Sequence, residues 1–270
     1  MAVVNILGVE VDQVTFTGAI EQISSFIDHG QPHQIVTVNP EFIMRAQHDR
    51  AFRKVLLEAD LAVPDGAGLI WASRILARRA PRRARHAKVT LTQRVTGTDL
   101  LPALAARAEH EGWRLYLLGG GPGVAARAAQ ILKLHHPKLK IVGAESGPLL
   151  SDDGKPISLD QAALLDAALA RIHHAKPHLL FVAFGAPKQD RFIARNRNEL
   201  KVPVKIGVGG AFDFMTGSAR RPPAHRGWRP RRLRGGPELP LLEVPGRLDR
   251  VHRRGRRPPR PGRGGRRRGH

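Results

Sequence analysis

A carboxylate in a tight, glycine-flanked turn is the first feature of the sequence that could do chemistry. Pro64-Asp65-Gly66-Ala67-Gly68 follows a short apolar run, so the acid stands at the end of a predicted strand. An Asp held there can take a proton from an attacking hydroxyl group. The alternative is a turn residue that caps the next helix. Asp65 is therefore a candidate general base, and Gly66 beside it a candidate substrate-binding position.

A hydroxyl and an amide leave a second predicted strand together in Thr37-Val38-Asn39-Pro40. Both groups can form hydrogen bonds with a sugar or a phosphate, which makes Thr37 and Asn39 candidate catalytic-site residues. The alternative is that Asn39 only caps a helix, with Pro40 at the first helical position.

A third candidate is the glycine turn Leu118-Gly119-Gly120-Gly121-Pro122-Gly123-Val124. Glycines between a strand and a helix bring backbone N–H groups and the helix dipole to bear on phosphate oxygens. The G-x-G-x-x-G spacing fails, and Glu145 is the nearest acid in the usual downstream region, so a nicotinamide or flavin site is disfavoured. A bare tight turn remains the alternative. The candidate phosphate-binding positions are Gly119, Gly120 and Gly121.

The fourth candidate consists of two segments: the start of a predicted helix with a Lys, and a second glycine turn. Phe184-Gly185-Ala186-Pro187-Lys188-Gln189-Asp190 offers Lys188 for a phosphate and Gln189 for a base or a sugar. Residues 207–214 (GVGGAFDF) follow, with Gly209 in a turn small enough for close backbone approach and Asp213 as a candidate binding acid. Asp213 has a capping or structural role as its alternative.

The elements that must position these residues alternate along residues 1–217. Because strands alternate with helices, we expect an α/β domain with a parallel sheet that is covered by helices. Each of the four constellations lies at or near the carboxyl end of a predicted strand, where open parallel sheets bind ligands. The predicted strands are 34–38, 61–63, 114–118, 139–142, 178–184 and 204–208, and the predicted helices are 41–58, 69–76, 98–111 (capped by Thr98 or Asp99), 124–135, 159–174 and 188–200.

Composition limits the class of protein and where it works. The sequence of 270 residues has no Cys, which excludes disulfides and thiolate metal sites. The N-terminus lacks the basic and long apolar regions of a signal peptide, and no apolar run approaches the length of about 20 residues that spans a bilayer. We expect a cytoplasmic protein that at most rests on the inner face of the cell membrane.

The charge is concentrated in a tail of different composition. Residues 218–270 hold 18 Arg, no Lys and 3 acids, whereas residues 1–217 hold 27 Lys or Arg and 20 acids. The tail also has 9 Gly and 9 Pro, so we expect it to be a largely disordered basic segment outside a catalytic domain of residues 1–217. It is either a tail that binds membrane or nucleic acid, or the product of an altered reading frame, which the loss of all Lys favours.

Some motifs are missing from the sequence. It has no D-x-D, H-E-x-x-H or G-x-x-x-x-G-K-[ST], and its His residues are scattered. A metal site is therefore not indicated, and we expect no cofactor. The basic segment 79–86 is expected to be an exposed loop, either simply solvated or a lip that meets phosphate or anionic lipid headgroups.

Together these motifs resemble the WecG/TagA/CpsF family of glycosyltransferases. They occur in the family's order and span about residues 5 to 217, and the ordered set is specific although each motif alone is weak. The matching segments are 37–41 (TVNPE), 64–68 (PDGAG), 94–99 (RVTGTD), 117–120 (LLGG), 122–125 (PGVA), 184–190 (FGAPKQD) and 207–214 (GVGGAFDF).

The resemblance implies a Rossmann-like, mostly parallel sheet with helices on both faces, and an inverting, metal-independent enzyme. It implies a UDP-sugar donor, often UDP-N-acetylmannosamine, and an undecaprenyl-diphosphate-linked N-acetylglucosamine as the acceptor. By similarity, Asp65 matches the proposed general base. Thr37, Asn39 and Gln189 match residues of the catalytic pocket, and the Gly119–Gly123 turn is expected to face the nucleotide diphosphate.

The chain departs from the family at its C-terminal end. Members usually continue with aromatic and aliphatic helices that carry basic residues, meet the membrane and close the site with Arg. This chain keeps Gly217 and Arg221-Pro222-Pro223 and then turns into Arg/Gly/Pro sequence, so only Arg221 is carried over as a binding residue.

The expected function is transfer of a hexose or N-acetylhexosamine from a UDP-sugar to a polyprenyl-diphosphate-linked sugar in surface-polysaccharide synthesis. The expected partners are the donor, the lipid-linked acceptor and the cytoplasmic membrane surface, without a specific nucleic acid. The alternative is a nucleic-acid-binding protein that acts through its Arg-rich tail, with a steep salt dependence. Trp228 stands alone among those arginines, so base stacking is poorly supported.

Overall fold

The computed structural model describes residues 1–79 and 89–220, and its main feature is a six-stranded parallel sheet. The strand order is β4-β3-β8-β7-β5-β6, and every neighbouring pair is parallel. The predicted parallel α/β sheet is therefore confirmed. The strands are β3 (His33–Val38), β4 (Leu61–Pro64), β5 (Arg114–Gly119), β6 (Lys140–Glu145), β7 (Leu179–Ala183) and β8 (Val204–Gly207).

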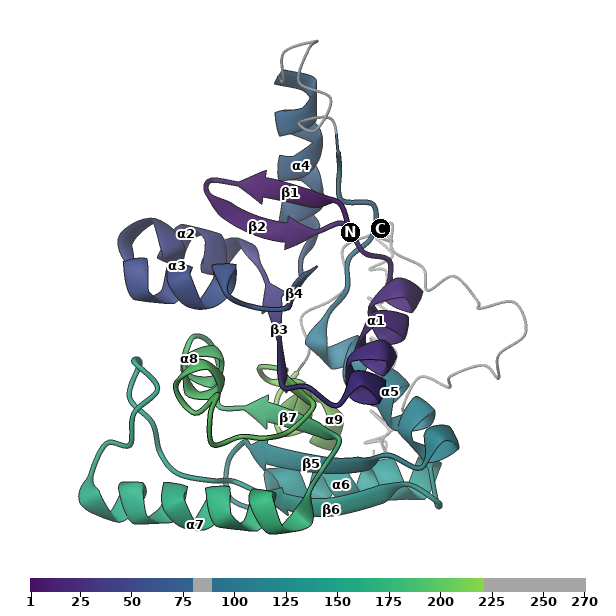
Figure 1. The fold of residues 1–270 in the computed structure, drawn as a ribbon, viewed down its shortest axis with the longest axis vertical. Helices are drawn as coiled ribbons and strands as arrows, with labels where there is room; N and C mark the ends of the chain where they lie inside the picture. Colours follow the sequence, from purple (N-terminus) through teal and green to yellow (C-terminus); the bar gives the residue numbers. More distant parts are fainter. Residues whose placement is uncertain (80–88, 221–270) are drawn as a thin grey trace, which may run out of the picture. The chain divides into compact units, whose positions relative to one another are not determined.

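Helices cover both faces of this sheet (Figure 1). On one face α1, α5, α9 and α6 contact one another in turn. On the other face, α2 and α3 share a buried cluster with β3, and α7 and α8 share one with β5 and β7. The helices are α1 (Phe16–His29), α2 (Pro40–His48), α3 (Arg50–Leu57), α4 (Ala67–Arg79), α5 (Gly97–Glu111), α6 (Val124–His135), α7 (Leu159–Ala175), α8 (Lys188–Arg195) and α9 (Ala211–Thr216).

Side-chain caps determine where two of the helices begin. The single helix predicted over 41–58 is wrong, because Asp49 leaves helical geometry and its side chain accepts the N–H of Phe52. That cap ends α2 and starts α3. The predicted cap of α5 is also corrected: Thr96, rather than Thr98 or Asp99, accepts the N–H of Asp99 and caps the helix.

Four elements in the structure have no counterpart in the sequence-based prediction. The strands β1 (Val3–Ile6) and β2 (Val9–Asp12) form an antiparallel hairpin, and α1 follows it. The hairpin packs against β4 and α4, and its valines belong to the buried cluster that also contains Val36 and Phe52. The fourth element is the short helix α9, which follows the second glycine turn.

All the described residues belong to one compact unit. The expected boundary between residues 217 and 218 and the expected disorder of the tail stay predictions, because residues 221–270 lie outside the described residues. The basic segment 79–86 also lies almost wholly outside the described residues. Within residues 1–79 and 89–220, no helix is both long enough and apolar enough to cross a bilayer.

Candidate functional site

The sequence-predicted residues gather at one edge of the sheet. The register pairs Val38 with Pro64, and Gly119 with Ala183, so the candidate turns follow strand ends that lie level with one another. The strand β8 ends beside β7, which brings the second glycine turn to the same edge. The structure thus assembles four segments that are far apart in the sequence.

The two features that matter most stand at different places along that edge. Asp65 follows β4, Gly119 ends β5, and the strands β3, β8 and β7 lie between them. At about 4.8 Å per strand, the separation across the sheet is about 19 Å. A ligand that meets both features must therefore be extended along the carboxyl edge, with its two ends at β4 and β5.

Asp65 is half-buried in a turn that is tied to the neighbouring strand. Its backbone N–H donates to the carbonyl of Val38 at 2.6 Å. Gly66 follows and lies against the ring of Pro40, the first residue of α2. The backbone that carries the carboxylate is therefore packed against the segment that carries Thr37 and Asn39.

Thr37 and Asn39 each have a structural partner. The Thr37 hydroxyl is buried and donates to the carbonyl of Gly207 at 3.2 Å, which links β3 to the end of β8. The side-chain carbonyl oxygen of Asn39 accepts the backbone N–H of Phe42 at 2.8 Å and caps α2. The capping role of Asn39 is thus present, and its amide nitrogen is the group that is left to donate to a ligand.

The glycine turn after β5 packs directly on the neighbouring strand. A Cβ at Gly119, where φ is 116°, would lie 2.6 Å from the carbonyl carbon of Ala183. The N–H of Gly120 donates to the carbonyl of Ala183 at 2.9 Å. The helix α6 begins without a side-chain cap, and the N–H of Val124 donates to the carbonyl of Gly121 at 3.0 Å, so the next N–H groups of the first turn are the ones left for an anion.

Gln189 lies beneath the second glycine turn. Its side chain is only 1% exposed, and its carbonyl oxygen accepts the N–H of Gly209 at 2.9 Å. The structure therefore places it as a support of the turn. Lys188 and Asp213 are half-buried, in the first turns of α8 and α9 respectively.

Asp190 is a buried acid that sequence reasoning quoted in a motif but assigned no role. Neither carboxylate oxygen has a hydrogen-bond partner among the described residues. Its Oδ1 would lie 2.8 Å from a Cβ at Gly207. Burial raises the pKa of this carboxyl group to about 7, because desolvation disfavours its charged form. Its place beside Gln189 in Pro187-Lys188-Gln189-Asp190 was the signal that could have found it.

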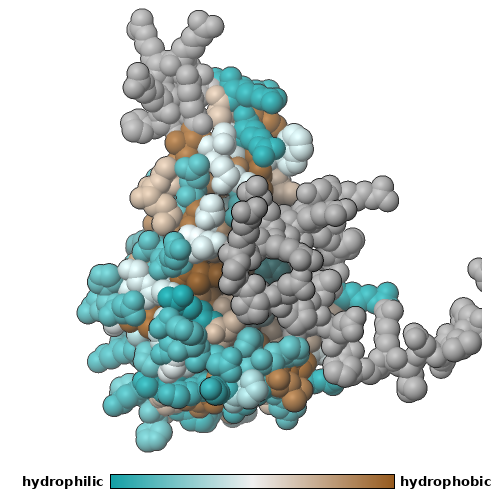
Figure 2. All heavy atoms as spheres, turned by 90° about the vertical axis from the view of Figure 1, so that its right-hand side faces the viewer, coloured by the Kyte–Doolittle hydropathy of each residue, from teal (hydrophilic) through white to brown (hydrophobic). Residues whose placement is uncertain are grey.

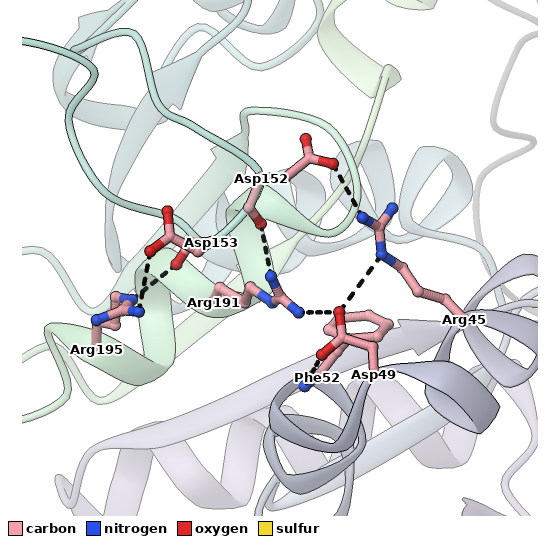
Figure 3. A network of polar contacts seen from close by, with 7 residues as sticks. All are labelled: Arg45, Asp49, Phe52, Asp152, Asp153, Arg191 and Arg195. Atoms are coloured by element: carbon pink, nitrogen blue, oxygen red, sulfur yellow. Dashed lines mark hydrogen bonds and ion pairs between the residues drawn. The ribbon is translucent and has the colours of Figure 1, made fainter.

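A polar network holds the two helices that begin at site residues (Figure 3). The guanidinium of Arg191 in α8 pairs with Asp49, lies 5.5 Å above the ring of Phe52, and donates to the carbonyl of Asp152 at 3.0 Å. Arg45 in α2 pairs with Asp152 at 2.9 Å. The network therefore fixes α8, which starts at Lys188, against α2 and α3.

The pKa of Asp49 reflects this network. Burial opposes ionisation, but the N–H of Phe52 and the charge of Arg191 outweigh it and hold the pKa below its usual value. Asp49 is therefore charged at neutral pH and is a lasting partner for Arg191.

Two cavities of the described residues lie away from these candidates. One, of about 630 Å³, lies between β6 and α7 and is lined by Tyr116, Glu145 and Arg171. The other, of about 300 Å³, lies where β5 and β7 begin and is lined by Arg114 and His178. Neither cavity is lined by a predicted site residue, so the candidate site is defined by the residues at the carboxyl edge of the sheet and not by a cavity.

Two further points concern Arg221 and metal binding. Arg221 lies outside the described residues. In residues 1–79 and 89–220, no three His, Asp or Glu side chains gather in a way that could hold a metal ion.

The parallel sheet and the turns at its carboxyl edge define an α/β enzyme of the Rossmann-like type. Comparison with known proteins gives the class: the model of the "Glycosyl transferase WecG/TagA/CpsF family" matches residues 4–227. The chain belongs to this family and is a glycosyltransferase. The family that the motifs resembled is thereby confirmed.

Curated relatives carry one name, "N-acetylglucosaminyldiphosphoundecaprenol N-acetyl-beta-D-mannosaminyltransferase". The relative from Bacillus subtilis is 30% identical over 75% of this chain and 73% of its own length. The one from Bacillus spizizenii is 27% identical over 80% of this chain and 74% of its own length. A Staphylococcus aureus relative is 28% identical over 82% of this chain and 79% of its own length.

Proposed function

We propose that this glycosyltransferase moves N-acetylmannosamine, or a related hexose or N-acetylhexosamine, from a UDP-sugar to a polyprenyl-diphosphate-linked N-acetylglucosamine. The observation that carries the proposal is the assembly of the Asp65 turn, the Thr37–Asn39 strand end and both glycine turns on one sheet edge. The names of the relatives support the acceptor and the sugar. The product would enter surface-polysaccharide synthesis.

The reaction needs one in-line attack at the anomeric carbon. The acceptor hydroxyl forms the new glycosidic bond as the bond from the anomeric carbon to the UDP oxygen breaks. Asp65 takes the proton of that hydroxyl, and UDP leaves with the bonding electron pair and an additional negative charge. The configuration at the anomeric carbon is inverted because a single displacement occurs.

The charge that develops on UDP needs preorganised donors. Gly121 and the uncapped first turn of α6 offer backbone N–H groups for the nucleotide end of the diphosphate, because the N–H groups of Gly120 and Val124 already have carbonyl partners. Lys188 at the start of α8 lies at the same edge and supplies a cation. Gly66, Gly209 and Asp213 are proposed to line the donor and sugar positions between these groups.

The spacing of the strands determines how the donor must lie along the edge. The strand that leads to Asp65 lies about 19 Å across the sheet from the strand that leads to the glycine turn. Because the anomeric carbon is bonded directly to the diphosphate, that carbon and the acceptor hydroxyl must lie close to Asp65 at β4, so the donor is proposed to extend along the edge over β8 and β7 with its nucleotide end toward the glycine turn at β5. Thr37 and Asn39, at the end of β3, adjoin the acceptor end.

The acceptor is proposed to remain in the membrane while it reacts. A polyprenyl chain partitions into the bilayer, so the enzyme must approach the inner face of the cell membrane. This localisation follows from the proposed acceptor. The alternative of nucleic-acid binding depends on residues 218–270, of which the structure describes only the first three.

The test is release of UDP from UDP-N-acetylmannosamine in the presence of a soluble short-chain polyprenyl-diphosphate N-acetylglucosamine. We expect release by the full chain and a loss of 10²-fold or more in Asp65→Asn, the size typical of a missing general base. Binding of the donor, measured by calorimetry, should persist in that variant. Equal turnover of Asp65→Asn would remove Asp65 as the base.

A further inference from the structure

We propose that the outward face of α4 is a membrane-contact surface that seats the enzyme on an anionic bilayer. This inference rests on the proposed function, because a lipid-linked acceptor requires such contact. The α4 outer face is defined by Trp71, Arg74, Ile75 and Arg78, which are all exposed. Their spacing of three and four residues places them on one side of the helix.

The opposite side of α4 anchors the helix in the protein. Leu69 and Ser73 are buried, and Leu69 belongs to the cluster shared with the β1–β2 hairpin. The hydroxyl of Ser73 accepts the N–H of Leu91 at 3.0 Å and donates to the carbonyl of Ile70 at 2.8 Å. The helix is therefore held on one side, while the side chains of its outer face are exposed.

The outer face combines two properties of helices that lie at a bilayer surface. Trp71 is 64% exposed and Ile75 is 48% exposed, so two large apolar side chains face outward on this helix. The helix carries three arginines and no acid in the sequence AGLIWASRILARR. Trp and Arg together suit the headgroup region, where the ring enters the apolar boundary and the guanidinium meets lipid phosphate.

The contact between the aromatic ring and the arginine supports this arrangement. The guanidinium of Arg74 lies 5.8 Å from the ring centroid of Trp71. Figure 1 shows α4 standing beside the hairpin, with its last turns extending beyond it. Figure 2 shows apolar and polar surface next to each other in the upper part of the described residues. A charged bilayer is the occupant that satisfies both kinds of surface.

The position of α4 links this surface to the chemistry. Asp65 precedes the first residue of α4 by two positions. Trp71 lies about 6 Å along the axis from Ala67, and Ile75 about 12 Å, at 1.5 Å per residue. Trp71 and Ile75 therefore lie within about 12 Å, along the helix, of the turn that carries the candidate base.

The test uses the full chain and vesicles of phosphatidylglycerol and phosphatidylcholine with brominated acyl chains. Trp228→Phe serves as the parent, because Trp113 is only 7% exposed and Trp71 then supplies the accessible fluorescence. We expect anionic vesicles to quench Trp71 and shift its emission to the blue, while pure phosphatidylcholine has a smaller effect. In a Trp-independent sedimentation assay, Trp71→Ser with Ile75→Ser should lower the vesicle partition coefficient about tenfold.

A matched control changes equally exposed apolar residues on other helices. Leu134→Ser with Leu164→Ser alters side chains that are 75% and 48% exposed in α6 and α7. This control should partition like the parent. Vesicle binding with unquenched Trp71 would overturn the proposal, since the tail alone would then make the contact. Self-association without vesicles that Trp71→Ser abolishes would also overturn it, since a second copy would then cover the face.

Activity separates this inference from the proposed function. The double variant at Trp71 and Ile75 should release UDP normally with the soluble short-chain acceptor and lose activity with a long-chain acceptor embedded in vesicles. Equal loss with both acceptors would refute the membrane role of α4. If the parent released no UDP with either acceptor, the proposed function would fail, and the quenching of Trp71 would still decide the role of α4.

Discussion

The side-chain oxygen of Gln189 accepts the backbone N–H of Gly209 at 2.9 Å, and this bond joins the start of α8 to the turn after β8. The two residues belong to different motifs, 184–190 and 207–214. Because Gln189 is buried, the bond is shielded from water and holds the turn in one conformation. Gln189 therefore acts as a positioning residue for the edge where the ligand is proposed to bind.

Gln189→Met should destabilise the turn at Gly209, while a side chain of similar size still fills the space that Gln189 occupies. The N–H of Gly209 loses its buried acceptor, which costs about 1–3 kcal/mol of folding free energy. We also expect a lower kcat/KM, because the turn is no longer fixed. Urea unfolding and UDP release measure the two effects. Gln161→Ala, which removes an exposed acceptor for Leu149, is the control, and an equally small effect in both variants would contradict the role of Gln189.

Gly119→Ala should damage the sheet edge itself. The added Cβ meets the backbone of Ala183 at 2.6 Å, so one of the two strands must move. Gly30→Ala is the matched control, because its φ of 71° is also positive and nothing lies within 4 Å of its Cβ. The control should cost about 1 kcal/mol for its conformation alone. Thermal unfolding should show a clearly larger loss for Gly119→Ala, and equal losses would argue against close packing at the turn.

Asp190→Asn should change how stability depends on pH. The folded carboxyl keeps its proton up to a pKa of about 7, whereas the unfolded one ionises near 3.8. The folded state binds more protons in that window, so this group lowers stability as pH rises through it, by up to about 1.4 kcal/mol per pH unit.

The measurement for Asp190 is the difference in unfolding free energy between the parent chain and Asp190→Asn at several pH values. The unfolding free energy of the variant should rise relative to that of the parent chain as pH rises toward 7. Asp160→Asn, an exposed acid in the first turn of α7, is the control and should leave the slope unchanged. A pH-independent difference for Asp190→Asn would show that the buried carboxyl does not titrate in this range.

Arg191→Met should loosen the network of Figure 3. The side chain of Arg191 is 11% exposed and pairs with Asp49, so its loss should cost about 2 kcal/mol. Arg195→Met, whose side chain is 46% exposed and pairs with Asp153, should cost far less.

Acid adds a second check on this pair. The pKa of Asp49 is held low in the folded state, so its contribution is present above the unfolded pKa and is lost as pH falls through the folded value. The cost of Arg191→Met should therefore shrink in acid. Chemical unfolding at neutral and acidic pH tests this, and a cost that grows on acidification would contradict the pairing.

The sequence predicted the parallel sheet because β-branched and apolar runs alternate with helical spacing. The helix over 124–135 was predicted with the bounds that α6 has. The break at Asp49 was missed because α2 and α3 continue one apolar pattern, and the break depends on a side-chain cap that periodicity does not show. The β1–β2 hairpin was missed because its strands have only four residues each and gain their stability by packing on α4 and β4.

The sequence predicted where the site residues lie on the strands, but it did not predict which groups they contact. The spacing of the motifs indicated that Thr37, Asp65 and Gly119 lie at or near the ends of strands, and the register places those strand ends at one edge. The order of the strands was not predictable, because β3 and β8 pair across about 170 residues of sequence. For the same reason, the bond from Gln189 to Gly209 and the burial of Asp190 could be seen only in three dimensions.

The place of β8 has a consequence for synthesis on the ribosome. Its four residues form the last strand along the described part of the chain, yet they lie between β3 and β7 and join two parts of the sheet that have no other described strand between them. Until residue 207 has emerged from the exit tunnel, the nascent chain holds β4-β3 and β7-β5-β6 with open inner edges. The sheet therefore closes late, and its two halves need protection from wrong pairing while translation continues.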